Sequence, residues 1–150
     1  MSHYLIRHAQ AANAEDDRIR PLSERGRIQV ERLCLSLGPF FRPTQIWHSP
    51  LTRARETATL LAQGLGLNIP FVEIPDLSPD ADPFPVATLL RAQQDEIAVV
   101  GHEPNLSVLA AILTGEKPRA GMTGFATGGT LSLSPGPGGL CASEWLVRAP

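Results

Sequence analysis

Short apolar runs alternate along this chain with segments in which apolar side chains recur every three to four residues. Runs of the first kind are typical of strands. They predict strands at Tyr4–Arg7, Gln45–His48, Phe71–Ile74, Glu96–Val100, Thr130–Ser134 and Leu140–Arg148. The last two flank a turn rich in proline and glycine, residues 135–139, which predicts a hairpin.

Helices are expected between these strands, and several carry terminal signals. Ser23 is a predicted N-cap of a helix that Gly38 ends. Ser49-Pro50 predicts an N-cap and a first helical residue, with an apolar face continuing to Gly64. Two more helices are expected at residues 85–94 and from about Leu106 to Leu113, before Gly115, whereas residues 75–85 are predicted to form an irregular loop.

This alternation of strands and helices with short connections predicts an α/β protein, a three-layer sandwich around a mostly parallel sheet. With 150 residues and 43% hydrophobic content, the chain is expected to form one domain, residues 1–150. The formal net charge of −2 predicts neither a nucleic-acid nor a membrane partner. No apolar stretch approaches the roughly 20 residues of a spanning helix, and no leader pattern is evident, so we expect a cytoplasmic protein.

Two histidines follow strands that a parallel sheet would place side by side. Arg7-His8 comes at the end of the first strand, and Gly101-His102 directly follows Val100. The carboxyl ends of parallel strands meet at one edge of the sheet, where ligands bind and where helix N-termini add partial positive charge. The sequence therefore predicts a site at this edge that contains both imidazoles.

Arginines gather around the same predicted edge, together with one serine. Arg7 precedes His8, Arg20 lies in the following loop, and Ser49 and Arg53 follow the second strand. Guanidinium forks match phosphate oxygens in pairs, so this set predicts a phosphate site. Two alternatives remain open: each arginine could instead pair with a nearby acid, Glu15, Asp16, Asp17 or Glu56, and Ser49 could serve only as a cap. Arg55 is expected to point about 200° away from Arg53 on the helix.

Four ordered segments resemble the histidine phosphatase superfamily, which has the phosphoglycerate mutase-like fold. They are Tyr4-Leu5-Ile6-Arg7-His8-Ala9, Arg20-Pro21-Leu22-Ser23 with Gly26, the run from Ser49 to Thr57, and Val99 to Leu106. The short chain is most similar to the SixA-type phosphohistidine phosphatases, the minimal form without a large cap insertion. One departure is Ala9, at a position where the family usually has glycine.

The resemblance implies a role for each residue of the site. His8 is the nucleophile, Arg7, Arg20 and Arg53 hold the phosphoryl group, and His102 completes the pocket. Neutral imidazole is a good nucleophile, and its attack on phosphorus divides hydrolysis into formation and breakdown of a phosphohistidine. The other ring nitrogen of His8 should donate to a backbone carbonyl in the loop after Ala9. No metal or other cofactor is expected, because the arginines supply the positive charge.

A general acid is the open point of this mechanism. Hydrolysis of an alkyl ester needs an acid to protonate the leaving oxygen, whereas a phosphohistidine leaves as imidazole and needs little such help. Glu103 and Asp76 are the candidate acids, and each could equally have a structural role.

We therefore expect a metal-independent phosphatase whose partner is a phosphohistidine-bearing protein, such as a histidine-phosphotransfer domain, and whose product is inorganic phosphate. The alternatives are a phosphatase of a small phosphate ester and a non-catalytic phosphate- or phosphoprotein-binding domain. A mutase is disfavoured, because little chain remains for a cap that would retain its substrate.

Overall fold

The computed structural model describes residues 2–116 and 124–148. Its sheet has the strand order β3-β2-β4-β1-β5-β6. The strands are β1 (His3–Arg7), β2 (Gln45–His48), β3 (Phe71–Glu73), β4 (Ile97–Gly101), β5 (Thr130–Pro135) and β6 (Cys141–Val147). Strands β1 to β4 are mutually parallel, whereas β5 and β6 add an antiparallel hairpin beside β1.

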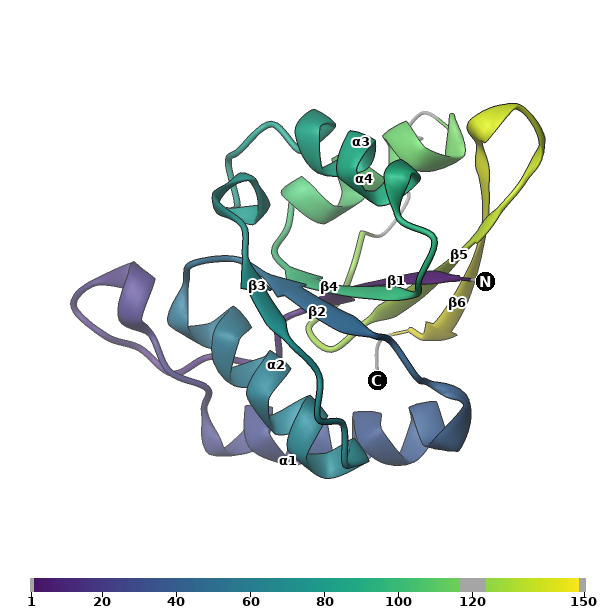
Figure 1. Cartoon of the computed structure of the whole chain (residues 1–150). Coiled ribbons are helices and arrows are strands. Elements are labelled where there is room, and N and C mark those ends of the chain that lie inside the picture. Colours follow the sequence, from purple (N-terminus) through teal and green to yellow (C-terminus); the bar gives the residue numbers. More distant parts are fainter. Residues whose placement is uncertain (1, 117–123, 149–150) are drawn as a thin grey trace.

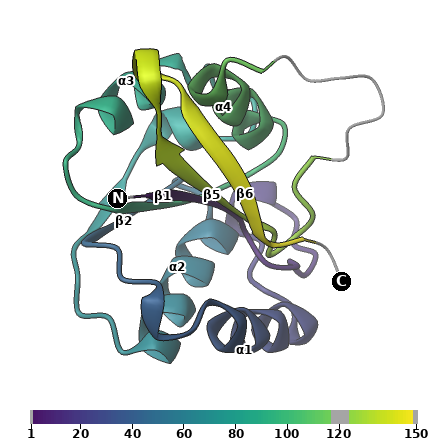
Figure 2. The ribbon, with the colours of Figure 1, turned by 90° about the vertical axis from the view of Figure 1, so that its right-hand side faces the viewer.

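Within the described part of the chain, four α-helices cover the two faces of this sheet (Figure 1). They are α1 (Glu24–Leu37), α2 (Thr52–Leu65), α3 (Phe84–Ala92) and α4 (Asn105–Thr114). Helices α1 and α2 lie on one face and α3 and α4 on the other, as both views show (Figures 1 and 2). An apolar cluster fills each interface, so the predicted three-layer α/β sandwich with a mostly parallel sheet is confirmed.

The first predicted cap is confirmed and the second is wrong. The Ser23 hydroxyl accepts a hydrogen bond from the Gly26 amide and caps α1, which ends at Gly38 as expected. Helix α2, however, begins at Thr52, with Leu51 as its N-cap residue. The Ser49 hydroxyl accepts from the Leu51 amide (3.2 Å), which precedes the helix, and also contacts the His102 ring across the sheet edge.

Two further boundaries differ from the prediction. Helix α2 continues through Gly64, and Gly66 is its C-cap residue. Gly64 allows α2 to pack closely on α1, since a Cβ there would lie 2.6 Å from the Cys34 sulfur. The segment predicted to be irregular contains a 3₁₀ turn at Pro75–Leu77, whose Leu77 is fully buried. This proline-rich segment is held by burial of Leu77 and by the Asn105 side chain, which donates to the carbonyls of Asp76 (3.0 Å) and Ala81 (2.9 Å).

Across the described residues, no helix is long and apolar enough to cross a membrane.

Candidate active site

The parallel strands bring the predicted site residues to one edge, as expected from their positions in the sequence. Arg7 at the end of β1 is in register with Gly101 at the end of β4, and His48 of β2 is in register with Val100. Backbone hydrogen bonding to β4 continues for one residue beyond the ends of β1 and β2. The His8 amide donates to the Gly101 carbonyl (2.9 Å), and the Ser49 amide donates to the Val100 carbonyl (3.3 Å).

His8 is a neutral imidazole, and one of its ring nitrogens is engaged in a hydrogen bond to the backbone. Its Nδ1 lies 2.7 Å from the Ala9 carbonyl oxygen. A carbonyl can only accept, so Nδ1 carries the proton and Nε2 keeps the lone pair that a nucleophile needs. Burial, together with the positive charges of Arg53, Arg7 and Arg20, lowers the pKa of His8 from 6.5 to about 4. A backbone carbonyl orients His8 as predicted, but it is that of Ala9 itself and not one in the loop after Ala9.

Alanine fits at position 9 without backbone strain, although the family usually has glycine there. Among the described residues, no residue other than glycine has a positive φ, so the turn after His8 does not require the conformational freedom of glycine. The Ala9 side chain is buried and belongs to the apolar cluster on the α1 and α2 face.

His102, which directly follows β4, lies beside His8, which directly follows the neighbouring strand β1. The two ring centroids are 5.0 Å apart. His102 is 1% exposed, its Nε2 lies 2.5 Å from the Ser49 hydroxyl, and its Nδ1 has no hydrogen-bond partner among the described residues. Burial lowers its pKa to about 3, with the proximity of His8 as the next cause. The site therefore presents two neutral imidazoles side by side.

All three predicted arginines lie close enough to His8 for their charges to lower its pKa, and Arg53 and Arg7 also lower the pKa of His102. Arg7 donates from Nη1 to the Phe125 carbonyl (2.8 Å), and its buried Nε has no partner among the described residues. Arg53 is 6% exposed, whereas Arg55 is exposed, so the helix faces the site as predicted.

Arg20 and Arg53 converge on one carboxylate, that of Asp17. Arg20 Nη1 lies 3.2 Å from Asp17 Oδ1, and Arg53 Nη2 lies 3.3 Å from Asp17 Oδ2. The alternative of pairing with a nearby acid is thus realised for these two arginines. The Asp17 side chain is 63% exposed, so its ion pairs are screened by solvent and weak, about 0–1 kcal/mol each. Two guanidiniums that converge on one carboxylate are also spaced to contact the oxygens of one phosphate group.

Comparison with known proteins agrees with this geometry. Residues 3–78 match the sequence profile of the histidine phosphatase superfamily, branch 1. The chain belongs to this superfamily. Membership makes the protein a phosphatase by class, and the phosphoglycerate mutase-like fold is confirmed.

Among solved structures, histidine phosphatases of the SixA type are similar over nearly the whole chain. The protein histidine phosphatase SixA complexed with tungstate has 26% sequence identity and a TM-score of 0.86, covering 97% of this chain and 95% of that one. The putative phosphohistidine phosphatase SixA from Agrobacterium tumefaciens has 29% identity and a TM-score of 0.76, covering 89% and 91%.

A putative alpha-ribazole-5'-P phosphatase from Escherichia coli shares the fold at 20% identity, with a TM-score of 0.77 and coverage of 99% and 97%. No curated protein sequence matches the chain.

The two candidate general acids lie in different surroundings. Both Glu103 oxygens accept hydrogen bonds: from the Ser107 amide (2.9 Å) and hydroxyl (2.6 Å), and from the Phe125 amide (3.1 Å). Glu103 therefore ties the start of α4 to the residue whose carbonyl holds Arg7 in this phosphatase. The Asp76 side chain is exposed, and the contact of this residue is made by its backbone carbonyl, which accepts from the Asn105 side chain (3.0 Å).

Among the described residues, no group of three or more histidine, cysteine or acidic side chains is arranged to hold a metal ion.

Thr57 is a site residue that sequence reasoning missed. Its buried hydroxyl donates to the Arg53 carbonyl (2.7 Å) and accepts from the Ala9 amide (3.0 Å). It thereby fixes the residue whose carbonyl orients His8. The available signal was spacing: Thr57 lies four residues after Arg53, and so on the same helix face.

We expect Thr57→Val to lower kcat about tenfold with little change in KM, because the valine leaves the buried Ala9 amide unpaired and the acceptor of His8 free to shift. Thr57→Ser keeps the hydroxyl and should restore kcat to within about threefold of wild type. The His8 Nδ1 proton, followed by NMR, should exchange faster in the valine variant only. Equal kcat values in both variants would refute this positioning role.

Burial of His8 also predicts how stability depends on pH. Its pKa is about 4 when folded and near 6.5 when unfolded, so the unfolded chain binds more protons between these values. The free energy of unfolding should therefore fall as the pH falls through this window, by about 2 kcal/mol from His8 alone between pH 7 and 5. Urea unfolding at both pH values measures the loss. His8→Asn, which does not titrate, should lose about 2 kcal/mol less than wild type, and an identical loss would contradict the low pKa.

Proposed function

We propose that this phosphatase hydrolyses phosphohistidine on a protein partner through a phosphohistidine intermediate at His8. The observation that carries the proposal is the buried, neutral His8 whose Nδ1 is fixed by Ala9 and whose surroundings hold Arg7, Arg20 and Arg53. Such a group can attack phosphorus at neutral pH, while the guanidiniums stabilise the charge of the transferred phosphoryl group.

The proposed reaction has two balanced steps. In the first, the His8 Nε2 lone pair forms a bond to phosphorus, and the P–N bond of the substrate breaks. The substrate imidazole takes the bonding pair and leaves neutral, because its far ring nitrogen already carries a proton from water. In the second, water attacks the phosphorylated His8, gives one proton to solvent, and releases inorganic phosphate while His8 becomes neutral again.

Two buried nitrogens suit the proposed phosphoryl group. Arg7 Nε and His102 Nδ1 have no hydrogen-bond partner among the described residues. An unpaired buried polar group is costly, and phosphoryl oxygens would satisfy the donor on Arg7 directly. The similar SixA structure was solved with tungstate, a tetrahedral oxyanion of the same shape as phosphate.

A phosphohistidine substrate is favoured over an alkyl ester by the surroundings of the two acids. Protonating an alkoxide requires a carboxyl group free to reach the leaving oxygen. Both oxygens of Glu103 are instead engaged with Ser107 and Phe125. An imidazole leaving group removes this requirement.

The experiment compares a chemically phosphorylated histidine-phosphotransfer domain with a panel of alkyl and aryl phosphates. We expect Glu103→Gln and Asp76→Asn to change kcat on phosphohistidine by less than about tenfold, since a working general acid contributes about 10² to 10⁴. Turnover should also survive dialysis against EDTA.

An alkyl phosphate with a much higher kcat/KM than phosphohistidine, lost in either carboxyl variant, would instead establish a small-molecule phosphatase. Failure to trap ³²P-labelled protein from any substrate would favour the non-catalytic binding domain.

A further inference from the structure

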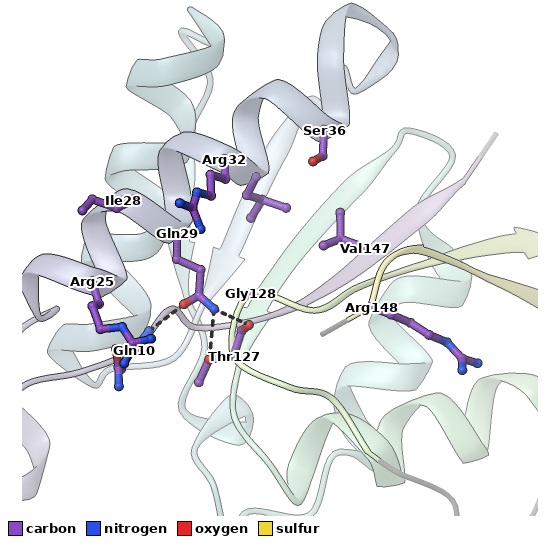
Figure 3. A pocket seen from close by; sticks show the side chains of 11 residues that line it. Gln10, Arg25, Ile28, Gln29, Arg32, Ser36, Thr127, Gly128, Val147 and Arg148 are labelled. Atoms are coloured by element: carbon purple, nitrogen blue, oxygen red, sulfur yellow. Dashed lines mark hydrogen bonds between the residues drawn. The ribbon is translucent and has the colours of Figure 1, made fainter. Parts of the chain in front are cut away.

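A cavity of about 560 Å³ lies outside the candidate active site, between α1 and the end of β6 (Figure 3). We call it the α1 groove. It is lined by one face of α1, by Gln10, by the Thr127–Gly128 turn and by Val147 and Arg148. The α1 residues recur at helical spacing, Arg25, Ile28, Gln29 and Arg32, so a single helix face forms one wall.

The charged side chains that line the α1 groove are arginines. Arg25, Arg32 and Arg148 line it, and none of the described lining residues is acidic. Among the described residues none of these three guanidiniums takes part in an ion pair, and Arg148 lies over the Trp145 ring at 5.4 Å. Because the whole chain carries a net charge of −2, this positive potential is a local feature of the surface.

The α1 groove shares its backbone with the candidate active site. Gln10 follows His8 by two residues, and the Gly128 amide donates to the carbonyls of Arg7 (3.0 Å) and His8 (3.3 Å). The Gln29 side chain joins these two walls, accepting from the Gln10 amide (3.0 Å) and donating to the Thr127 carbonyl (2.8 Å), as Figure 3 shows. A protein that placed a side chain at His8 would therefore extend over this groove.

We infer that the α1 groove docks an acidic surface of the protein that carries the phosphohistidine. This inference rests on the proposed function. Complementary charge at a rim of this kind steers encounter and selects partners, which lowers KM without altering the chemical step. The half-exposed Ile28, at 42%, supplies an apolar contact between Arg25 and Arg32.

A small anion fits this surface less well than a protein does. Arg25, Arg32 and Arg148 are all exposed, unlike the buried Arg53 of the active site. Exposed charges are screened and contribute little individually, so they become selective only when several act on one extended partner. An acidic protein face meets this condition, whereas a single phosphate does not.

The test reverses the charge of the groove and compares it with a matched control. The groove variant is Arg25→Glu, Arg32→Glu, Arg148→Glu. The control variant reverses three exposed arginines elsewhere, Arg42, Arg55 and Arg91, and so changes the net charge equally. Substrates are a phosphorylated acidic histidine-phosphotransfer domain and free phosphohistidine, and binding of the unphosphorylated domain is measured by calorimetry.

We expect the groove variant to raise KM for the phosphorylated domain at least tenfold with kcat unchanged, and to weaken binding of the unphosphorylated domain. Its kcat/KM for free phosphohistidine should stay within about twofold of the control variant. Equal KM values in the two variants would overturn the docking site, as would tighter binding of a single-stranded oligonucleotide than of the acidic domain.

The calorimetric binding measurement distinguishes failure of this inference from failure of the proposed function. If wild type hydrolyses no phosphohistidine but binds the acidic domain, and only the groove variant loses that binding, the docking surface stands and the proposed function fails. Absence of binding to the wild-type protein would overturn the docking surface, whatever the substrate.

Discussion

Turnover should be abolished in His8→Ala, while the fold is retained. The loss of a covalent nucleophile normally lowers kcat by orders of magnitude, because the remaining groups can only stabilise a reaction that no longer has an attacking atom. His8 directly follows β1 and belongs to neither apolar cluster, so its replacement removes no contact within the core. Circular dichroism should therefore match wild type. Retention of more than about a tenth of the activity would refute the assignment.

His48 offers a matched control for this substitution. It also ends a parallel strand, is equally buried, and its Nδ1 lies 2.8 Å from the carbonyl of the next residue, Ser49. His48→Ala removes the same ring from the same kind of position and should keep turnover within about tenfold. Labelling with ³²P-phosphohistidine gives a second measurement: an acid-labile phosphoprotein should form with wild type and with His48→Ala, but not with His8→Ala.

Each of Arg7→Ala, Arg20→Ala and Arg53→Ala should lower kcat/KM by about 10² or more. Contacts from a guanidinium to a phosphoryl group are charge-assisted, and where water is excluded they contribute several kcal/mol to the transition state. The same variants should weaken inhibition by phosphate and vanadate. Steady-state kinetics with inhibitor titration measures both effects.

Two further variants distinguish a phosphate site from a surface ion pair. Arg55 is exposed on the other side of α2, so Arg55→Ala should change kcat/KM by less than about threefold. Asp17→Asn removes the carboxylate on which Arg20 and Arg53 converge, and should stay within about tenfold of wild type, since exposed ion pairs contribute at most about 1 kcal/mol each. If Asp17→Asn were as damaging as Arg53→Ala, the ion pair itself would be the function of these arginines.

Local sequence patterns predicted helix ends correctly at some positions and failed at others. Ser23 caps α1 because its hydroxyl accepts from the Gly26 amide while donating its own proton to the Gln10 carbonyl (3.2 Å), and Gly38 ends the helix with positive φ. At Ser49 the same local signal failed. Its hydroxyl meets His102, which is 53 residues away in sequence, and α2 starts three residues later.

The sequence by itself determined which chemistry this edge could carry. The strand-end histidines and the arginines follow from hydrophobic pattern and residue type, because a parallel sheet places the exits of its strands together. Only the tertiary structure decided how these groups are held: Ala9 as the acceptor for His8, Thr57 as the clamp on Ala9, and Asp17 between two arginines. Two of these contacts, Ala9 with Thr57 and Arg53 with Asp17, join residues far apart in the sequence. The energies of buried contacts such as that of Ala9 with Thr57 depend on burial, which exists only once the layers have packed.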